Sequence, residues 1–196
     1  MRADAIRNRA KILDAARVEI AAQGPEVGMD AIAAAAGVAV GTLYRHFPTK
    51  VDLVAAVLEE YVEQVTAEAA AALDAVHAGA RTPLSALIGF LVEVIRISAV
   101  NKAAKGAAST LGAEDRLDES RAASAVAELI RLGIATGEVR ADLTVADIYL
   151  VFASAPLDQP EAVRDRWMQL VLPCLTADAA VIRLAGMPQR PGEPGR

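Results

Sequence analysis

Apolar residues recur at spacings of three and four along most of this 196-residue chain, and no stretch alternates regularly between apolar and polar residues. The first spacing places side chains on one face of a helix, whereas alternation would place them on one face of a strand. Alanine, the strongest helix former, is abundant. The pattern therefore predicts an all-α protein, and a hydrophobic content of 54% is enough for a substantial core.

Glycine and proline divide this pattern into separate helices. Gly37 is a natural left-handed stop for the predicted helix 30–36. Pro48 ends the predicted helix 40–47. Gly106 and Gly112 are expected to interrupt a weak segment. The predicted helices cover about 3–23, 30–36, 40–47, 114–136, 145–155 and 161–175, with two long helices that begin after Thr49 and Thr82.

Capping residues support three of the predicted helix starts. Thr49 is followed three residues later by Asp52, and Thr144 by Asp147, so each pair predicts a capping box. Thr82 precedes a proline, which is favoured in the first turn of a helix. The first helix is expected to bury Ile6, Leu13, Ala16 and Ile20. The fourth is expected to bury Val54, Val57, Leu58, Tyr61 and Val65, and to turn Glu59, Glu60, Glu63 and Glu68 toward water.

The formal net charge of −5 argues against a nucleic-acid partner, but the charge is unevenly distributed. Residues 1–50 hold seven Lys and Arg against five Asp and Glu, whereas residues 51–196 hold 13 against 20. The N-terminal quarter is therefore the only part whose charge favours a polyanion.

The sequence favours a cytoplasmic protein. Its longest run without a charged residue, 31–44, is shorter than the roughly 20 residues that span a bilayer. No apolar block follows the basic N-terminus, so we expect no secretory signal and no membrane partner. The single cysteine, Cys174, cannot form an internal disulfide, which fits a reducing compartment.

Catalytic chemistry has little support in this sequence. The only histidines are His46 and His77, and no Cys/His cluster has metal-ligand spacing. Cys174 lies on an apolar stripe and is expected to be a small core residue. Gly37 and Gly41 follow no predicted strand, so they do not form a phosphate-binding loop. We therefore predict no enzymatic activity, no cofactor and no metal.

The segment "AGVAVGTLYRHFPTK", residues 36–50, combines a glycine turn with many hydrogen-bond donors. At about 100° per residue, residues 40–47 form an apolar back (Val40, Leu43, Phe47), a front (Gly41, Thr42, Arg45) and two flanks (Tyr44, His46). A helix in the DNA major groove needs such a front for bases and flanks for phosphates. Lys50 follows in the first turn of the next helix, which favours anions. An ordinary surface helix is the alternative interpretation, but the pattern is typical of a helix-turn-helix.

The longer segment "IAAAAGVAVGTLYRHFPTKVDLV", residues 32–54, resembles the helix-turn-helix signature of the TetR family of transcriptional regulators. The matching residues are Ile32, Ala33, Ala36, Gly37, Val38, Gly41, Thr42, Leu43, Tyr44, His46, Phe47, Lys50 and Leu53. The resemblance implies phosphate contacts by Thr42, Tyr44, His46 and Lys50. It implies base contacts by Val40, Gly41 and Arg45.

The same resemblance implies a domain organisation. A DNA-binding domain of three helices would occupy 1–50, and a larger helical domain for ligand binding and dimerisation would occupy 51–185. The segment 186–196 is rich in proline and glycine and is expected to be disordered.

Two positions depart from the family pattern. Gly28 and Ala39 stand where the family has serine or threonine before its second helix and often serine before its third. Alanine at an N-cap loses about 1 kcal/mol, and glycine a few tenths. Our hypothesis is that arginines of the first helix, such as Arg7 and Arg9, compensate electrostatically.

A single reading helix contacts few bases, so such modules act as two-fold dimers on palindromic DNA. The last two helices are the predicted dimer surface, because two such pairs can form a four-helix bundle. The predicted interface residues, which are also compatible with ordinary core, are Tyr149, Phe152, Trp167, Leu170, Val171 and Cys174.

A pocket for a small apolar ligand is predicted among the helices of the larger domain, where alanine and glycine leave room. Its predicted lining residues, each also compatible with plain core, are Phe90, Val94, Ile97 and Leu129. The fourth helix would link the pocket to DNA.

The sequence therefore predicts a dimeric, ligand-responsive repressor released from a palindromic operator. An activator or nucleoid-type binder of the same fold is one alternative. The other is an all-helical scaffold that has lost DNA binding, which Gly28, Ala39 and the acidic net charge keep open.

Overall fold

The computed structural model describes residues 2–112 and 120–178, and within them the fold is all-α, as predicted. The only β-type pairing among these residues is an isolated bridge between Val139 and Thr176. The helices are α1 (Arg2–Gln23), α2 (Met29–Ala36), α3 (Val40–His46), α4 (Lys50–His77), α5 (Pro83–Leu111), α6 (Ser120–Ala135), α7 (Val145–Ala153) and α8 (Glu161–Val171), followed by the 3-10 helix η2 (Leu172–Leu175).

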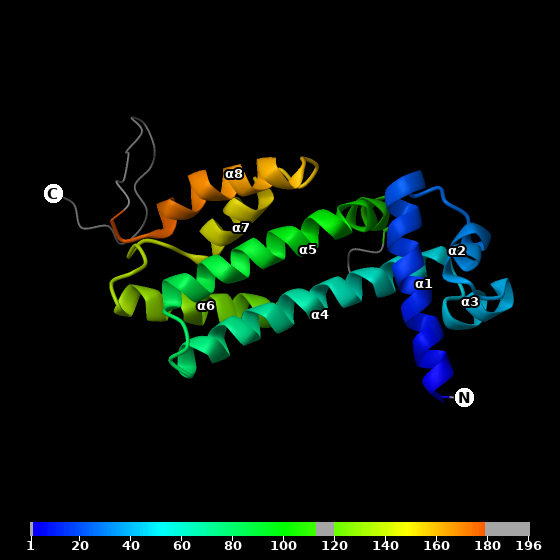
Figure 1. Ribbon diagram of the computed structural model, residues 1–196, viewed down its shortest axis with the longest axis horizontal. Helices are drawn as coiled ribbons and strands as arrows, with labels where there is room; N and C mark the ends of the chain where they lie inside the picture. The colour runs from blue at the N-terminus through cyan, green and yellow to red at the C-terminus, as the bar shows by residue number, and fades with distance from the viewer. Residues whose placement is uncertain (1, 113–119, 179–196) are drawn as a thin grey trace.

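Two long antiparallel helices, α4 and α5, form the axis of the molecule (Figure 1). Helix α1 crosses one end of this pair, and α2 and α3 pack beyond it. Helices α6, α7 and α8 gather at the other end, with α6 packed against both α4 and α5. We call the α1–α3 end the head and the α6–α8 end the body.

Each end of the molecule has its own apolar core. The head core consists of buried residues from α1, α2, α3 and the first turns of α4, up to Leu58, together with Ala104, Ala107 and Ala108 of α5. The body core begins at Ala69 of α4 and includes α5 as far as Ile95, α6, and residues down to Leu175. Both long helices therefore contribute to both cores.

A small polar layer on α4 and α5 lies between the two cores in sequence. The Tyr61 hydroxyl is 3.0 Å from the Ser98 hydroxyl, and both side chains are buried. One turn further along α5, Asn101 is also buried, and its Nδ2 donates to the Ile97 carbonyl at 2.8 Å. These are the buried polar side chains that interrupt an otherwise apolar α4–α5 interface.

Local sequence signals account for the helix ends. Both predicted capping boxes form: the Thr49 hydroxyl accepts from the Asp52 amide, and Thr144 and Asp147 do the same at α7. The Thr82 hydroxyl caps α5, with proline in the first turn. Gly37 ends α2 with φ at 67°, the left-handed conformation that favours glycine.

Other predicted boundaries are wrong. Helix α5 passes through Gly106 without a break and ends only at Gly112. The last predicted helix, 161–175, is shorter, because α8 ends at Val171 and a 3-10 helix follows. The predicted start of the sixth helix near residue 114 and the predicted disordered tail lie outside the described residues.

Some predictions about burial are also wrong. Ile6 is 67% exposed, and the residues of α1 that belong to the head core begin only at Ile12. Glu60 does not simply face water, because it accepts hydrogen bonds from Arg9 and Arg17 of α1. Cys174, expected in the core, is exposed on the 3-10 helix that follows α8.

Helix α5 is long and apolar enough to cross a membrane by length and composition, with a mean hydropathy of 1.8 in its most apolar window. A search for uncharged runs overlooks it, because Glu93 and Arg96 interrupt the sequence. In the structure, 44% of that window is buried inside the protein, and α5 is the central helix against which α1, α4 and α6 pack.

Two helical glycines provide a matched test of this packing. A Cβ added at Gly133 in α6 would lie 2.4 Å from Cγ2 of Val139, whereas one at Gly106 in α5 meets nothing within 4 Å. Gly106→Ala should therefore stabilise the protein by up to about 1 kcal/mol through helix propensity. Gly133→Ala should destabilise it despite the same gain in propensity, because the clash forces β-branched Val139 to move. Urea unfolding followed by circular dichroism measures both changes, and equal effects would contradict this packing.

Candidate nucleic-acid interface and ligand cavity

The exposed face of α3 is the candidate DNA-reading surface. Leu43 and Phe47 are buried in the head core, as the helical spacing predicts. Val40 is 40% exposed instead, so the prediction that it faces the core is wrong. It is the first residue of α3 and does not belong to the head core, so its side chain is available to a partner.

The predicted DNA contacts on α3 all reach solvent to some degree. Gly41, Tyr44 and Arg45 are exposed, and Thr42 and His46 are half-buried. A Cβ added at Gly41 meets nothing within 4 Å, so packing inside the protein does not require glycine there. Among the residues that the structure describes, Arg45 forms no ion pair, which leaves its guanidinium available for an outside acceptor.

Neither α2 nor α3 has a side-chain N-cap. Gly28 and Ala39 occupy the N-cap positions in extended conformations, and neither provides a side-chain hydrogen bond. The turn between the helices depends on Gly37, whose backbone amide bonds to carbonyls of α2. The short helices are therefore held by packing of Ile32, Leu43 and Phe47 more than by their own ends.

Lys50 has a structural role that its sequence position did not reveal. It is the first residue of α4, and its Nζ donates to the carbonyl of Pro25 and, at 2.6 Å, to that of Val27. These carbonyls belong to the turn between α1 and α2. The lysine therefore ties α4 to that turn, and two of its three donor positions are already used.

Much of the positive charge of α1 is also paired within the protein. Arg9 and Arg17 both bond to Glu60 of α4, and Arg7 bonds to Asp4. Arg9 additionally lies over the Phe47 ring, 5.7 Å from its centroid. The Arg9 and Arg17 pairs join α1 to α4, whereas the Arg7 pair lies within α1. All three limit the charge that α1 can offer to DNA, so the electrostatic compensation by Arg7 and Arg9 is still a hypothesis.

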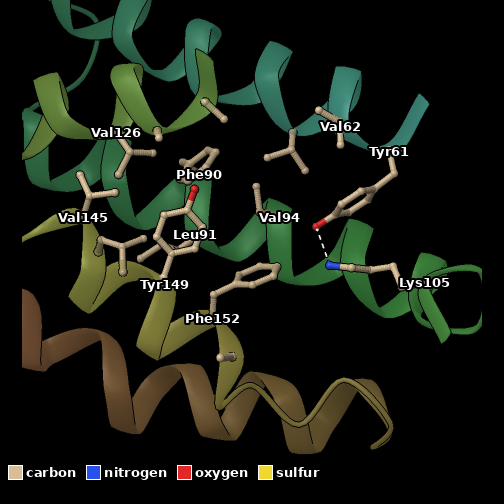
Figure 2. Close-up of a pocket in the computed structure, with 15 residues that line it drawn as sticks. Tyr61, Val62, Phe90, Leu91, Val94, Lys105, Val126, Val145, Tyr149 and Phe152 are labelled. Atoms are coloured by element: carbon tan, nitrogen blue, oxygen red, sulfur yellow. Dashed lines mark hydrogen bonds between the residues drawn. The ribbon is translucent and has the colours of Figure 1, made fainter. Parts of the chain in front are cut away.

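The body contains a cavity of about 310 Å³. The lining residues belong to α4, α5, α6 and α7, and Figure 2 shows their side chains around the space. The lining residues are Tyr61, Val62 and Val65 of α4, Phe90, Leu91, Val94 and Lys105 of α5, Ala122, Ala123 and Val126 of α6, and Val145, Ile148, Tyr149, Phe152 and Ala153 of α7. The volume lies at the lower end of the range for small-molecule sites.

Sequence reasoning located part of this lining. Phe90 and Val94 line the cavity, as predicted. Ile97 and Leu129 are not among the lining residues, and Leu129 is completely buried in the body core. Tyr61 and Lys105 were missed because they lie on different helices 44 residues apart, and no local pattern links them.

The six predicted dimer residues have different environments. Tyr149 and Phe152 line the cavity, and Phe152 and Trp167 pack against the body core. Leu170 is 60% exposed, Val171 is half-buried, and Cys174 is exposed. Two further apolar residues, Leu150 of α7 and Val163 of α8, are exposed on the same pair of helices. The pair therefore presents an apolar surface that the described residues do not cover.

Comparison with known proteins agrees with this arrangement. A family profile described as bacterial regulatory proteins, tetR family, matches residues 12–57, which contain the helix-turn-helix. No curated protein sequence matches the chain. Among solved structures, a TetR transcription regulatory protein from Mycobacterium vanbaalenii is 34% identical, with 89% of this chain and 98% of that chain covered and a TM-score of 0.66. A TetR transcriptional regulator from Streptomyces coelicolor is 27% identical, with coverage of 87% and 99% and a TM-score of 0.65.

A more distant structure, described as a gamma-butyrolactone receptor, is 22% identical over 84% of each chain, with a TM-score of 0.60, and shares the fold. The helical fold and the exposed reading helix define a DNA-binding transcriptional regulator and not an enzyme. The chain belongs to the TetR family.

Lys50 and Arg45 should respond differently to loss of charge. Lys50→Met leaves the Pro25 and Val27 carbonyls without their donor, so it should lower the free energy of unfolding by about 1–3 kcal/mol. Arg45→Met removes an exposed group with no ion pair, so its effect on stability should stay within about 0.5 kcal/mol. Thermal and urea unfolding of both variants, without DNA, tests this difference. Equal stability of the two variants would show that the Lys50 bonds contribute nothing in solution.

Proposed function

We propose that this regulator is a homodimeric repressor that leaves a palindromic operator when a small, largely apolar molecule enters the body cavity. The observation that carries the proposal is the path of α4. This helix begins beside α3 at the capped Thr49 and lines the cavity at Tyr61, Val62 and Val65. A ligand in the cavity thus contacts the helix that carries the head.

The proposed division of labour follows from this path. Residues 1–50 read DNA, and 51–185 bind ligand and form the dimer. The head core also includes Ala104, Ala107 and Ala108 at the end of α5, so the head packs on both long helices. A change in the angle between α4 and α5 would therefore alter the packing of the head on these two helices.

The proposed DNA contacts are those that the family resemblance implies and that α3 presents. Val40, Gly41 and Arg45 would face base edges, while Thr42, Tyr44 and His46 would contact phosphates. Lys50 would reach a phosphate only with the donor position that its carbonyl bonds leave unused.

The proposed dimer interface is the exposed apolar surface of α7 and α8, with Tyr149, Leu150, Val163 and Leu170 at its surface. Apolar residues gathered in this way mark a protein–protein contact. Two copies of the α7–α8 pair would form a four-helix bundle and set the distance between two reading helices.

DNA binding is tested with double-stranded fragments that flank the gene, by fluorescence anisotropy at several salt concentrations. The wild type should bind one palindrome tightly, with an affinity that falls steeply as salt rises. Arg45→Ala should weaken binding by about 1–3 kcal/mol and relax the preference at one base pair of each half-site. Tyr44→Phe should weaken binding of all sequences alike.

Lys102→Met is the matched control, because it removes an exposed cation of α5. Its affinity should equal that of the wild type. Binding that is independent of salt, or equal in the wild type and Arg45→Ala, would support the scaffold alternative instead.

The dimer interface is tested by charge insertion. Leu170→Glu should convert the dimer to a monomer in sedimentation velocity, because it would bury two unpaired carboxylates across the two-fold axis. Val18→Glu changes an equally exposed apolar residue on α1 and should leave the dimer intact. A monomeric wild type, or a Leu170→Glu dimer as stable as the wild type, would contradict the proposed interface.

A further inference from the structure

Among the described residues that line the cavity, a single side chain is charged, that of Lys105. We propose that the ligand is an amphipathic anion: an apolar molecule with one negatively charged group, such as a carboxylate, that binds the ammonium of Lys105. This inference rests on the proposed ligand-controlled function and names the chemical class of the ligand.

The position of Lys105 is the first support. It is half-buried on α5, and its Nζ lies 4.7 Å from the centroid of the Tyr61 ring and 5.8 Å from that of the Phe152 ring. Figure 2 shows the ammonium and the Tyr61 hydroxyl facing each other at one end of the lined space. The side chain is therefore held at the cavity by two aromatic residues and does not extend freely into solvent.

The lack of a counter-charge is the second support. None of the described residues that line the cavity carries a carboxylate. Within the described ranges, the Lys105 ammonium donates to the Tyr61 hydroxyl, and this hydrogen bond is long, at 3.4 Å. Aromatic faces attract an ammonium, but they leave its three N–H donors without strong acceptors. A bound anion would supply acceptors and form charge-assisted hydrogen bonds.

A neighbouring lysine shows the contrast. Lys102 lies one turn earlier on α5, and its Nζ is 3.7 Å from a carboxylate oxygen of Asp158. Within the described ranges, Lys105 forms no such pair. The two lysines carry the same charge on the same helix, but only Lys105 lines the cavity.

The remaining lining limits the ligand to one charged group. Away from Lys105 the walls are formed largely by aliphatic and aromatic side chains, including Val62, Val65, Leu91, Val94 and Val126. A second charge placed against these walls would lose its hydration without a partner. The cavity therefore suits an apolar tail with a single anionic end and disfavours polyphosphates and sugars.

The location of Lys105 also places the anionic group of the proposed ligand close to the head. Tyr61 follows Leu58, the last head-core residue of α4, by one turn, and Lys105 follows Ala104, a head-core residue of α5. The charged end of the ligand would therefore lie at the head end of the cavity. There it would contact both long helices beside the Tyr61–Ser98 bond.

The test uses three probes with the same ten-carbon chain and different charge: decanoate, decan-1-ol and decyltrimethylammonium. Their affinities are measured by isothermal titration calorimetry with the full-length protein, below the concentrations at which the probes form micelles. The variants are Lys105→Met, Lys105→Arg and, as a control, Lys102→Met.

The wild type should bind decanoate at least about tenfold more tightly than decanol, and should bind the cationic probe most weakly. Lys105→Met should lose the preference for decanoate and retain or improve its affinity for decanol, which also shows that the cavity is intact. Lys105→Arg and Lys102→Met should keep the preference for decanoate.

Two different failures can be told apart. If the wild type binds decanol and decanoate equally, or if Lys105→Met keeps the preference, the cavity takes ligands but Lys105 does not select an anion, and this inference is overturned. If none of the three probes binds the wild type, the proposed ligand-binding function of the cavity fails together with it.

Discussion

The packing of α4 against α5 is the interaction on which the rest of the structure depends. These two helices, of 28 and 29 residues, run through both apolar cores in opposite directions. Helices α1–α3 do not close the head core by themselves, because Leu53, Val54 and Leu58 of α4 and three alanines of α5 complete it. The body core likewise includes buried residues from the distal half of α4 and the first half of α5. In the proposed mechanism, a change in one core would reach the other through these two covalently continuous helices.

The polar layer between the cores gives this interface a fixed register. Tyr61 and Ser98 satisfy each other in a buried setting, where an unpaired hydroxyl is costly. If α5 slid along α4, the Tyr61 and Ser98 hydroxyl groups would separate and lose their hydrogen bond. In the two apolar cores, the same slide would replace one apolar contact with another. Such buried, satisfied pairs favour one arrangement over its alternatives. Tyr61 of this layer also lines the cavity, so the proposed ligand would contact a residue that sets the register.

The sequence was informative wherever the relevant interaction is local. The helix-turn-helix, both capping boxes and the glycine stop at Gly37 each depend on residues within one or two turns of each other. Helix α5 shows the opposite case: Gly106 weakens its local propensity, but packing of Ala104, Ala107 and Ala108 into the head core carries the helix through. Val40 was misplaced because ideal periodicity takes no account of where a seven-residue helix meets its neighbours.

The sites were harder to predict than the fold for the same reason. Lys50 carries a phosphate-binding signature in sequence, but its carbonyl partners at Pro25 and Val27 are defined only when α1 folds back on α4. Phe90 and Val94 could be assigned to a cavity from their helix alone. Lys105 and Tyr61 could not, since their proximity requires the relative rotation of two helices that the sequence pattern leaves undetermined.

The Lys50 bonds tie the start of α4 to the turn between α1 and α2, so in the proposed mechanism α4 would act as a lever arm on the head. With a rise of 1.5 Å per residue, Lys50 lies about 22 Å along the helix from Val65 at the cavity. A tilt of about 5° at Val65 therefore moves the attached head by about 2 Å. In the proposed dimer, opposite tilts would change the span between the two reading helices by up to about 4 Å, against the roughly 34 Å that separates successive major grooves on one face of DNA. In the proposed mechanism, a displacement at the cavity no larger than a rotamer change would thus be amplified, by the length of α4 alone, into a mismatch with the operator.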